Sequence, residues 1–429
     1  MLPDINTHTA TLPSGMRLLT MERPGTSLVT VGIAIAAGTR HEQPQESGMA
    51  HLVEHMTFKG TARRTAAQVA RRMDSVGADL GAFTGKEETV FYCTCLPEHQ
   101  RRATELLTDI VFHSTYPEAE LEHEVDVVCD EIDLYLDTPT EQIFDDFEAH
   151  LFSSSPLGRN ILGDASLLRH HTAADLRAFA ARHYRPEQAL MFVAGPKATK
   201  ATPPPWQWER RGADSSDGTS AQAHQPARAH TEAGTQFSHS RDTTGSTSET
   251  IIHRPSHQAH VVIGGRAFAM SDPQKAAARL LLDVLGGPAL SSRLGTSLRE
   301  RRGLVYTVDA SLTTYTDTGY WAVYFGCDPA DARRCRRLVM NELQRLTTTP
   351  LAPRTLRAAV TALKGRMAVA AADTENAAIA IAKRYLHTGQ VVTTADIATQ
   401  LDQLTPEQLL TTAQALFSKA DTHTLAYMP

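Results

Sequence analysis

Hydrophobic positions alternate with polar ones in several short runs, and these runs recur in the same order along the two halves of the chain. Each half opens with an apolar strand, predicted over 27–38 ("SLVTVGIAIAAG") and over 259–265 ("AHVVIGG"). Two further strand-like runs follow in each half, at 79–96 and at 305–327. The pattern therefore predicts two sheets built from strands in the same chain order.

Helical periodicity follows these strands in both halves. Apolar residues recur at helical spacing over 98–113 and 117–136 in the first half, and over 330–346 and 353–371 in the second. Strands and helices are thus segregated along each half, which is typical of an α+β unit.

The two halves also end alike. The stretches from Thr172 to Pro196 and from Thr405 to Pro429 have equal length, and each begins with a threonine suited to a helix N-cap. Each then runs through a helix and a polar turn into a short apolar strand and a proline. We therefore predict a duplication: two homologous αβ-roll domains, each a mixed or antiparallel sheet flanked by helices.

A segment without apolar periodicity separates the halves. Residues 197–250 are rich in Ser, Thr, Ala, Gly and Pro, a composition that does not support a packed core. We expect a flexible linker there, between an N-terminal domain over 1–196 and a C-terminal domain over 251–429.

Composition narrows the class of protein. The 429 residues suit two or more domains, and 41% hydrophobic with 21% charged residues is typical of globular proteins. A net charge of −6 argues against nucleic acid as the main partner. No apolar run approaches the roughly 20 residues of a membrane span, and the N-terminal residues resemble neither a signal nor a transit peptide. Five cysteines without a CxxC pair indicate reduced, structural thiols. These features predict a cytoplasmic protein.

The stretch "HLVEH" at 51–55 is the first candidate for chemistry. In a helix over 45–59, His51 and His55 are four residues apart and lie on one face, close enough to hold one metal ion. Two neutral imidazoles suit zinc and leave room for a third ligand and a water molecule. Glu54 can reach that water without being a ligand itself, and a carboxylate there could accept its proton.

A third ligand is expected from a distant acidic helix, and the segment 118–139 ("EAELEHEVDVVCDEIDLYLDTP") fits. Glu124 and Glu131 are seven residues apart and share one helix face. A carboxylate from this helix would complete a site of two histidines and one glutamate with an open position. Spacing alone does not choose between Glu124, Asp130 and Glu131.

At this point the sequence resembles a known family. The stretch "GMAHLVEHMTFKGTARRTA" is similar to the signature of the inverted-motif zinc peptidases, in which HxxEH replaces HExxH. This family includes insulin-degrading enzyme, pitrilysin and the mitochondrial processing peptidase. The segments "LPSGMRLL", "GTRHEQPQESGMAH" and "PLGRNILG" also match, and the chain length resembles the short, processing-peptidase type of subunit.

The resemblance implies a role for each residue of the candidate site. It implies that His51, His55 and Glu131 bind one zinc ion per chain and that Glu54 is the general base. It further implies that Glu124 supports the ligands from behind, an arrangement that typically orients metal ligands.

Two more stretches resemble substrate-binding segments of the family. The stretch "LSSRLGTSLRERRGLVYTV" implies that Arg299 and Tyr306 hold the substrate and stabilise the oxyanion of the tetrahedral intermediate. The stretch "GADLGAFTGKEETVFY" resembles the edge strand that pairs with an extended substrate, with Gly81 and Ala82 at the contact. Gly81 stands where the family usually has asparagine, so one hydrogen bond to the substrate is expected to be lost.

We therefore expect a zinc endopeptidase that cleaves peptides or unstructured segments. The resemblance also implies that two chains close around a chamber, as a homodimer or as a heterodimer with a related subunit. The alternative is a non-catalytic peptide-binding or scaffold subunit of such a heterodimer. Family members of that kind lose HxxEH, whereas this chain keeps it.

Overall fold

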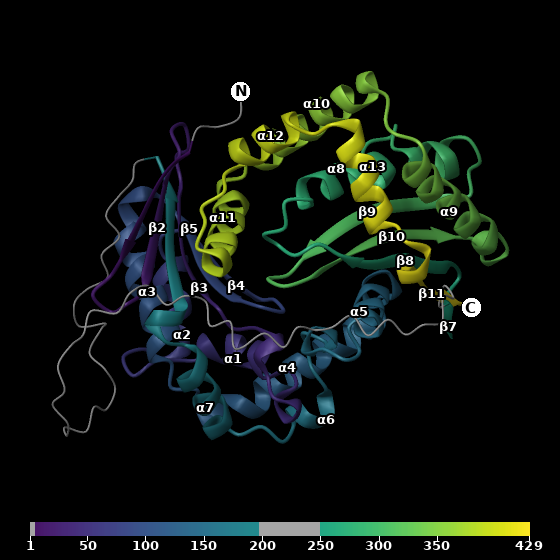
Figure 1. Ribbon diagram of the computed structural model, residues 1–429. Helices are drawn as coiled ribbons and strands as arrows, with labels where there is room; N and C mark the ends of the chain where they lie inside the picture. Colours follow the sequence, from purple (N-terminus) through teal and green to yellow (C-terminus); the bar gives the residue numbers. More distant parts are fainter. Residues whose placement is uncertain (1–4, 197–248) are drawn as a thin grey trace, which may run out of the picture.

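The computed structural model describes residues 5–196 and 249–429, which form two sheets with helices on both faces (Figure 1). The first sheet has the strand order β1-β2-β6-β3-β5-β4. Its strands are β1 (Asn6–Thr11), β2 (Arg17–Glu22), β3 (Val29–Ile35), β4 (Asp79–Thr84), β5 (Thr89–Cys95) and β6 (Ala189–Gly195).

The second sheet repeats this order as β7-β11-β8-β10-β9. Its strands are β7 (Glu249–His253), β8 (Ala259–Ala267), β9 (Val305–Thr314), β10 (Gly319–Cys327) and β11 (His423–Met428). Strands β2 and β6 pair in parallel, as do β7 and β11, and all other pairs are antiparallel. Apart from the extra β1, the two sheets have the same topology, which confirms the predicted α+β duplication.

Helices are present at the predicted segments 98–113, 117–136, 330–346 and 353–371, and further helices lie before, between and after them. Those of the first half are α1 (Met49–Thr57), α2 (Ala66–Asp74), α3 (Gln100–His113), α4 (Glu118–Leu136), α5 (Pro139–Leu151), α6 (Ala165–Leu168) and α7 (Ala173–His183). Those of the second half are α8 (Lys275–Gly286), α9 (Ala332–Thr348), α10 (Pro353–Ala370), α11 (Thr374–Thr388), α12 (Thr394–Asp402) and α13 (Pro406–Leu416). No helix within the described ranges is long and apolar enough to cross a membrane.

Two boundaries differ from the sequence prediction. The helix that carries "HLVEH" begins at Met49 and ends at Thr57, so it is shorter than the expected 45–59. Gly48 adopts a left-handed conformation with φ of 84°, which separates α1 from the short 3-10 turn before it. Strand β7 begins at Glu249, so the last two residues of the expected linker belong to the second sheet. The rest of that linker, 197–248, lies outside the described residues.

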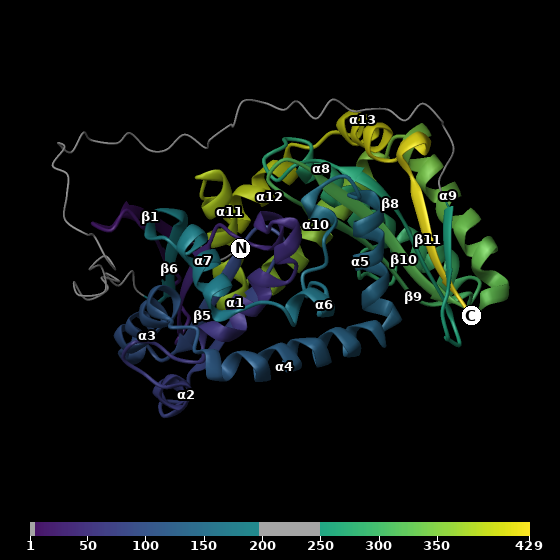
Figure 2. The same ribbon diagram turned by 90° about the horizontal axis from the view of Figure 1, so that it is seen from below.

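One face of each sheet is covered by helices of its own half, and the other face is covered by a helix from the opposite half. Helix α11 packs on β3 and β6 of the first sheet, where Ile381 and Ala382 join a buried cluster with Leu190 and Phe192. Figure 2 shows α5 against the second sheet, on strands β8 and β11. The division predicted at 196 and 251 therefore does not separate the two cores, because one helix of each half completes the other half.

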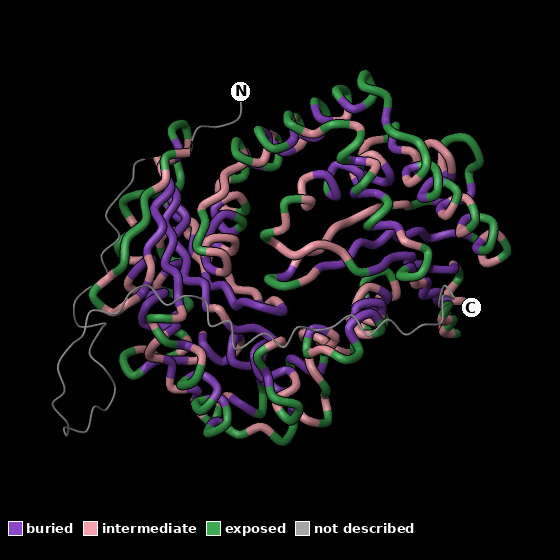
Figure 3. Tube along the Cα trace, in the orientation of Figure 1, coloured by how far each residue is buried: buried purple, intermediate pink, exposed green. Residues whose placement is uncertain are grey.

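Phe147 shows how closely α5 fits the second sheet. The ring is buried in a cluster with residues of β8, β10 and β11, and Gly264 of β8 leaves room for it. A Cβ atom at Gly264 would lie 2.8 Å from Cζ of Phe147. The central strands β6 and β10 are buried along their whole length, as the tube coloured by burial shows (Figure 3).

The turn between β4 and β5 carries three consecutive charged side chains that are all buried: Lys86, Glu87 and Glu88. Lys86 Nζ lies 3.3 Å from a carboxylate oxygen of Glu148 on α5. Glu88 pairs with Lys383 on α11 at 2.5 Å. A buried charge is tolerated only where a partner compensates it, so this turn requires α5 and α11 to stay in place.

The same turn also contacts the tip of the β9–β10 hairpin. Oε2 of Glu87 accepts a hydrogen bond from the backbone amide of Thr316 at 2.8 Å, and Oε1 accepts one from Arg40 at 2.6 Å. Arg40 in turn pairs with Asp317. These contacts join the first sheet to the second through polar groups.

Because α5 packs on the sheet of the opposite half, a core mutation in α5 should destabilise that sheet. Phe147→Ala should lower the free energy of unfolding by about 3–5 kcal/mol, because it leaves a cavity under the second sheet. Although Phe147 belongs to the first half of the chain, hydrogen exchange measured by mass spectrometry should rise mainly in β8, β10 and β11. Glu141→Ala, an exposed position on the same helix, is the control. Increased hydrogen exchange confined to β3 and β5 would contradict the packing of α5 on the second sheet.

Candidate metal centre

Helix α1 is held at its N-terminus by a buried carboxylate. Glu42 Oε1 accepts a hydrogen bond from the amide of Ala50 at 2.9 Å, and Oε2 accepts one from Gly48 at 3.3 Å. Burial raises the pKa of Glu42 to about 8, against these two hydrogen bonds, which lower it. Gly163 packs directly on Gly48, where a Cβ atom would lie 2.3 Å from the Gly48 Cα atom. The segment 156–163 thus fixes the start of the helix.

Helices α1 and α4 bring three candidate ligands together. Within the described residues, ligand atoms of His51, His55 and Glu131 lie within 4.8 Å of one another. One oxygen, Oε2 of Glu131, lies 3.7 Å from Nε2 of each histidine. Asp130, which spacing left open, is exposed and is not part of this group. Helix α4 therefore offers Glu131 as the third ligand.

Glu124 contacts the other side of His55. Its Oε2 atom lies 3.3 Å from Nδ1 of His55, and Lys59 pairs with the second carboxylate oxygen. A carboxylate on the nitrogen that faces away from a metal fixes the orientation of the ring and its tautomer. Glu124 therefore contacts the nitrogen of His55 that faces away from the candidate metal position. Glu131, seven residues later on the same helix, faces the two histidines.

The donor set fits zinc. Two imidazoles and one carboxylate are a common ligand set of catalytic zinc sites, which keep a further position open. Burial and the nearby His55 lower the pKa of His51 to about 3, so this imidazole is neutral at physiological pH, as a ligand must be. Nδ1 of His51 is buried and has no hydrogen-bond partner in the described part of the chain, so Nε2 is the nitrogen that faces Glu131.

Glu54 is buried next to these ligands and is held by the edge strand. The Thr84 hydroxyl, at the end of β4, donates a hydrogen bond to Oε2 of Glu54 at 2.5 Å. Burial raises the pKa of Glu54, whereas the Thr84 hydrogen bond and the nearby His55 lower it. A carboxylate with a raised pKa is suited to accept and release a proton.

Strand β4 is the outer strand of the first sheet and carries Gly81 and Ala82. Ala82 packs towards the core beneath α1, while Gly81 lies opposite Tyr92 of β5. A Cβ atom at Gly81 would lie 2.7 Å from both Cζ and the hydroxyl oxygen of Tyr92. The tyrosine ring thus fills the space that an asparagine side chain would need, which explains the glycine physically.

Arg299 and Tyr306 are not brought to the three ligands. Arg299 lies in a short π-helix, Gly295–Glu300, and pairs with Glu300 at 3.0 Å. Tyr306 is 79% exposed at the start of β9, about 30 Å along that strand from the β9–β10 turn that contacts Glu87. Within the described ranges, no hydrogen bond or ion pair joins either residue to the histidines or to Glu54.

Three supporting residues escaped the sequence analysis. Glu42, Lys59 and Thr84 hold α1, Glu124 and Glu54, respectively. Glu42 lies in the "GTRHEQPQESGMAH" stretch and Thr84 in "GADLGAFTGKEETVFY", so both segments had been singled out. No local pattern marks these three residues, however, because their contacts depend on tertiary packing.

Comparisons with known proteins agree with this geometry. Residues 17–165 match the model of the insulinase family of peptidases, M16, and residues 220–363 match that of the M16 inactive domain. An uncharacterized zinc protease of Mycobacterium leprae is 30% identical over 413 residues, covering 95% of this chain and 89% of the relative. The uncharacterized zinc protease YmxG of Bacillus subtilis is 28% identical over 409 residues, covering 95% of each.

Solved structures show the same fold. A protease from Helicobacter pylori superposes with a TM-score of 0.82 at 18% identity, covering 100% of both chains. A peptidase M16 inactive domain from Pseudomonas fluorescens gives 0.81 at 20% identity, covering 99% of this chain and 98% of the other. With the sequence matches in both halves, these findings show that the chain belongs to the M16, or insulinase, family of peptidases.

Proposed function

We propose that this protein is a zinc endopeptidase that hydrolyses peptides or unstructured polypeptide segments. One observation carries the proposal: buried Glu54 lies beside the group of His51, His55 and Glu131, so that a proton acceptor and a metal-binding set share one site. The names of the relatives, which are zinc proteases, support the same reaction class.

The residues of the chain divide the work of hydrolysis. Zinc held by His51, His55 and Glu131 would supply a Lewis acid that lowers the pKa of a water ligand to roughly 7. Glu54 accepts the proton of the attacking water and delivers it to the amine that leaves. Thr84 holds the carboxylate in position through its hydrogen bond, and Glu124 keeps His55 oriented through Nδ1. The side chains are thus in place before the substrate binds.

Within the described residues β4 pairs on one side only, and its other edge could pair with an extended substrate. An added peptide strand would pair with the backbone of Gly81 and Ala82 and run towards Thr84, whose hydroxyl contacts the base. Strand addition requires backbone groups that are not already paired, so unfolded segments qualify and folded domains do not.

A cytoplasmic location stays a prediction from the sequence.

A second chain would complete the site. Arg299 and Tyr306 can donate hydrogen bonds to an oxyanion, yet neither contacts the ligands of its own chain. We therefore propose a dimer, either of two identical chains or with a related subunit, in which these residues act on the site of the partner. A purely non-catalytic subunit is the alternative, but the presence of both ligands and base favours the enzyme.

The role of Glu54 predicts a specific separation of binding and turnover. Glu54→Gln should keep about one zinc per chain and reduce kcat for an unstructured peptide by at least about 100-fold, because the proton acceptor is lost. Metal analysis and a peptide cleavage assay measure the two properties. Glu122→Gln, an exposed glutamate on α4, is the control. Turnover equal to that of the parent would show that Glu54 is not the base.

The three acidic residues of α4 should differ in their effect on zinc affinity. Glu131→Gln should weaken zinc binding most, because it removes a ligand. Glu124→Gln should weaken it by about 10–100-fold through the loss of ring orientation. Asp130→Asn, at an exposed position, should leave it unchanged. Competition with a chromophoric chelator gives the order, and equal losses for Asp130→Asn and Glu131→Gln would rule out the assignment.

The dimer can be tested by mixing two defective variants. If two identical chains share residues across the site, Glu54→Gln and Tyr306→Phe homodimers are both impaired. A mixed dimer, however, has one intact site. Random exchange of subunits should therefore restore about a quarter of the parental activity. No recovery after exchange, verified by native mass spectrometry, would mean that Tyr306 does not act across the two chains.

A further inference from the structure

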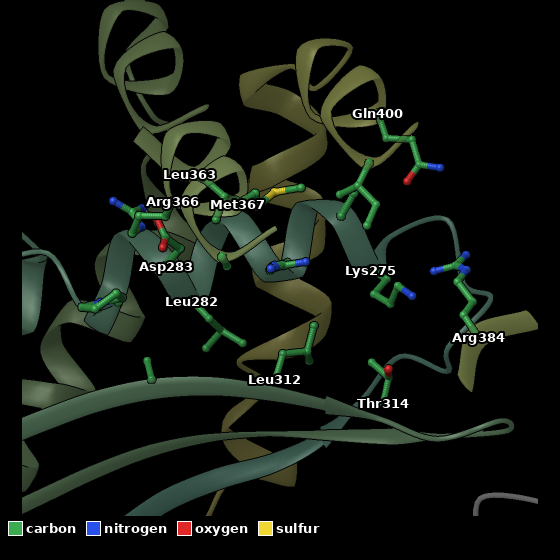
Figure 4. A pocket seen from close by; sticks show the side chains of 17 residues that line it. Lys275, Leu282, Asp283, Leu312, Thr314, Leu363, Arg366, Met367, Arg384 and Gln400 are labelled. Atoms are coloured by element: carbon green, nitrogen blue, oxygen red, sulfur yellow. The ribbon is translucent and has the colours of Figure 1, made fainter. Parts of the chain in front are cut away.

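A cavity of about 470 Å³ opens between helices α8 and α10 and strand β9, and several positively charged side chains line it. Three cationic side chains line it besides Arg366: Lys275 and Arg279 of α8, and Arg384 of α11. Figure 4 shows Lys275 and Arg384 near one another, with Arg366 and Asp283 at the opposite end of the view. The chain as a whole is acidic, with a net charge of −6, so this gathering of cations does not follow from composition.

The cavity has more cations than counter-charges. Among the described residues that line it, Asp283 is the one carboxylate; it pairs with Arg366 and also attracts Arg279, which leaves Lys275 and Arg384 without a carboxylate partner in the lining. Nε of Arg384 is buried without a hydrogen-bond partner in the described part of the chain. The ammonium of Lys275 donates to the carbonyl oxygen of Met270 at 2.7 Å, which leaves its charge uncompensated.

The electrostatic consequence appears on Lys275. Partial burial and the neighbouring Arg384 and Arg279 lower the pKa of Lys275 to about 8. Like charges held together in a partly desolvated cavity are unfavourable unless an anion joins them. The neighbouring walls are apolar, with Leu312, Leu363 and Met367 among them. The cavity therefore combines anion-binding groups with a surface that suits a carbon chain.

A second cavity, of about 620 Å³, connects this cluster to the edge strand. It shares Lys275, Arg279 and Arg384 with the first cavity, and its lining includes Phe83 of β4 and Tyr92 of β5. Those two residues lie next to Gly81, where an extended substrate is proposed to pair. The cations of the second half thus face the substrate-binding edge of the first.

We infer that the cluster of Lys275, Arg279 and Arg384 is a specificity subsite that binds a carboxylate of the peptide substrate, from an acidic side chain or a C-terminus. The inference rests on the proposed peptidase function and adds a substrate class to it. Continuity with β4 favours a peptide over a small free anion, because a peptide paired with β4 passes the cavity and can place an acidic residue in it.

The test compares two peptides that differ in charge alone. An unstructured peptide with aspartates spaced along its length and its asparagine counterpart are cleaved by the parent and by the double variant R279Q/R384Q. The parent should have a higher kcat/KM for the acidic peptide than for its asparagine counterpart. In the double variant the ratio of these two kcat/KM values should be lower by at least about fivefold. Raising the salt concentration should reduce the preference of the parent as well.

Two controls separate the subsite from general effects. R333Q/R337Q removes the same charge from exposed positions of α9 and should keep the parental ratio. R384Q alone is the second variant should the double variant fold poorly, and its ratio should fall in the same direction. An unchanged ratio in R279Q/R384Q or in R384Q, with parental zinc content and melting temperature, would overturn the subsite.

A binding measurement distinguishes failure of the subsite from failure of the peptidase proposal. Fluorescence anisotropy with the labelled acidic peptide is measured on Glu54→Gln, with and without R279Q/R384Q, and needs no turnover. Weaker binding in the combined variant supports the subsite even if the parent proves inactive. Inorganic phosphate that binds at the cluster while acidic and neutral peptides bind equally would assign the cavity to a free anion and overturn the inference.

Discussion

The buried charges of the β4–β5 turn are the constraint on which the rest of the molecule depends. Lys86, Glu87 and Glu88 are buried, and removing the partner of a buried charge typically costs about 3–5 kcal/mol. Their partners come from α5, from α11 and from the tip of the β9–β10 hairpin. The two halves are therefore held in one relative position at the same turn that sets the end of the edge strand.

This constraint reaches the candidate metal centre by two routes. The first is β4, whose last residue, Thr84, holds Glu54 just before the charged turn begins. The second is the pair of consecutive helices α4 and α5. Helix α4 carries Glu131 and Glu124, and after a short connection α5 packs on the second sheet, as Figure 2 shows. Glu54, Glu131 and the edge strand are thus fixed by elements that also join the halves, and the second cavity is lined by residues of both halves, Phe83 and Lys275 among them.

Much of this architecture could be predicted from the sequence. The repeated order of strands and the N-cap threonines at 172 and 405 are local signals, and the structure has capping boxes at both. The histidine pair followed from helical spacing. The choice between Glu124, Asp130 and Glu131 did not, because residues seven apart share a helix face and only packing decides which one reaches which nitrogen. Three features depend on contacts between distant segments: the packing of α5 and α11 on the sheet of the opposite half, the role of Thr84, and the fit of Tyr92 over Gly81.

The most direct test of the account is to titrate zinc back into metal-free protein while following hydrolysis of an unstructured peptide. Activity should be absent without zinc and should rise in proportion to bound metal until about one ion per chain is present, since a single group of ligands holds it. Full hydrolysis by the metal-free protein, or none at saturating zinc, would contradict the assignment of His51, His55 and Glu131 as the centre of a peptidase.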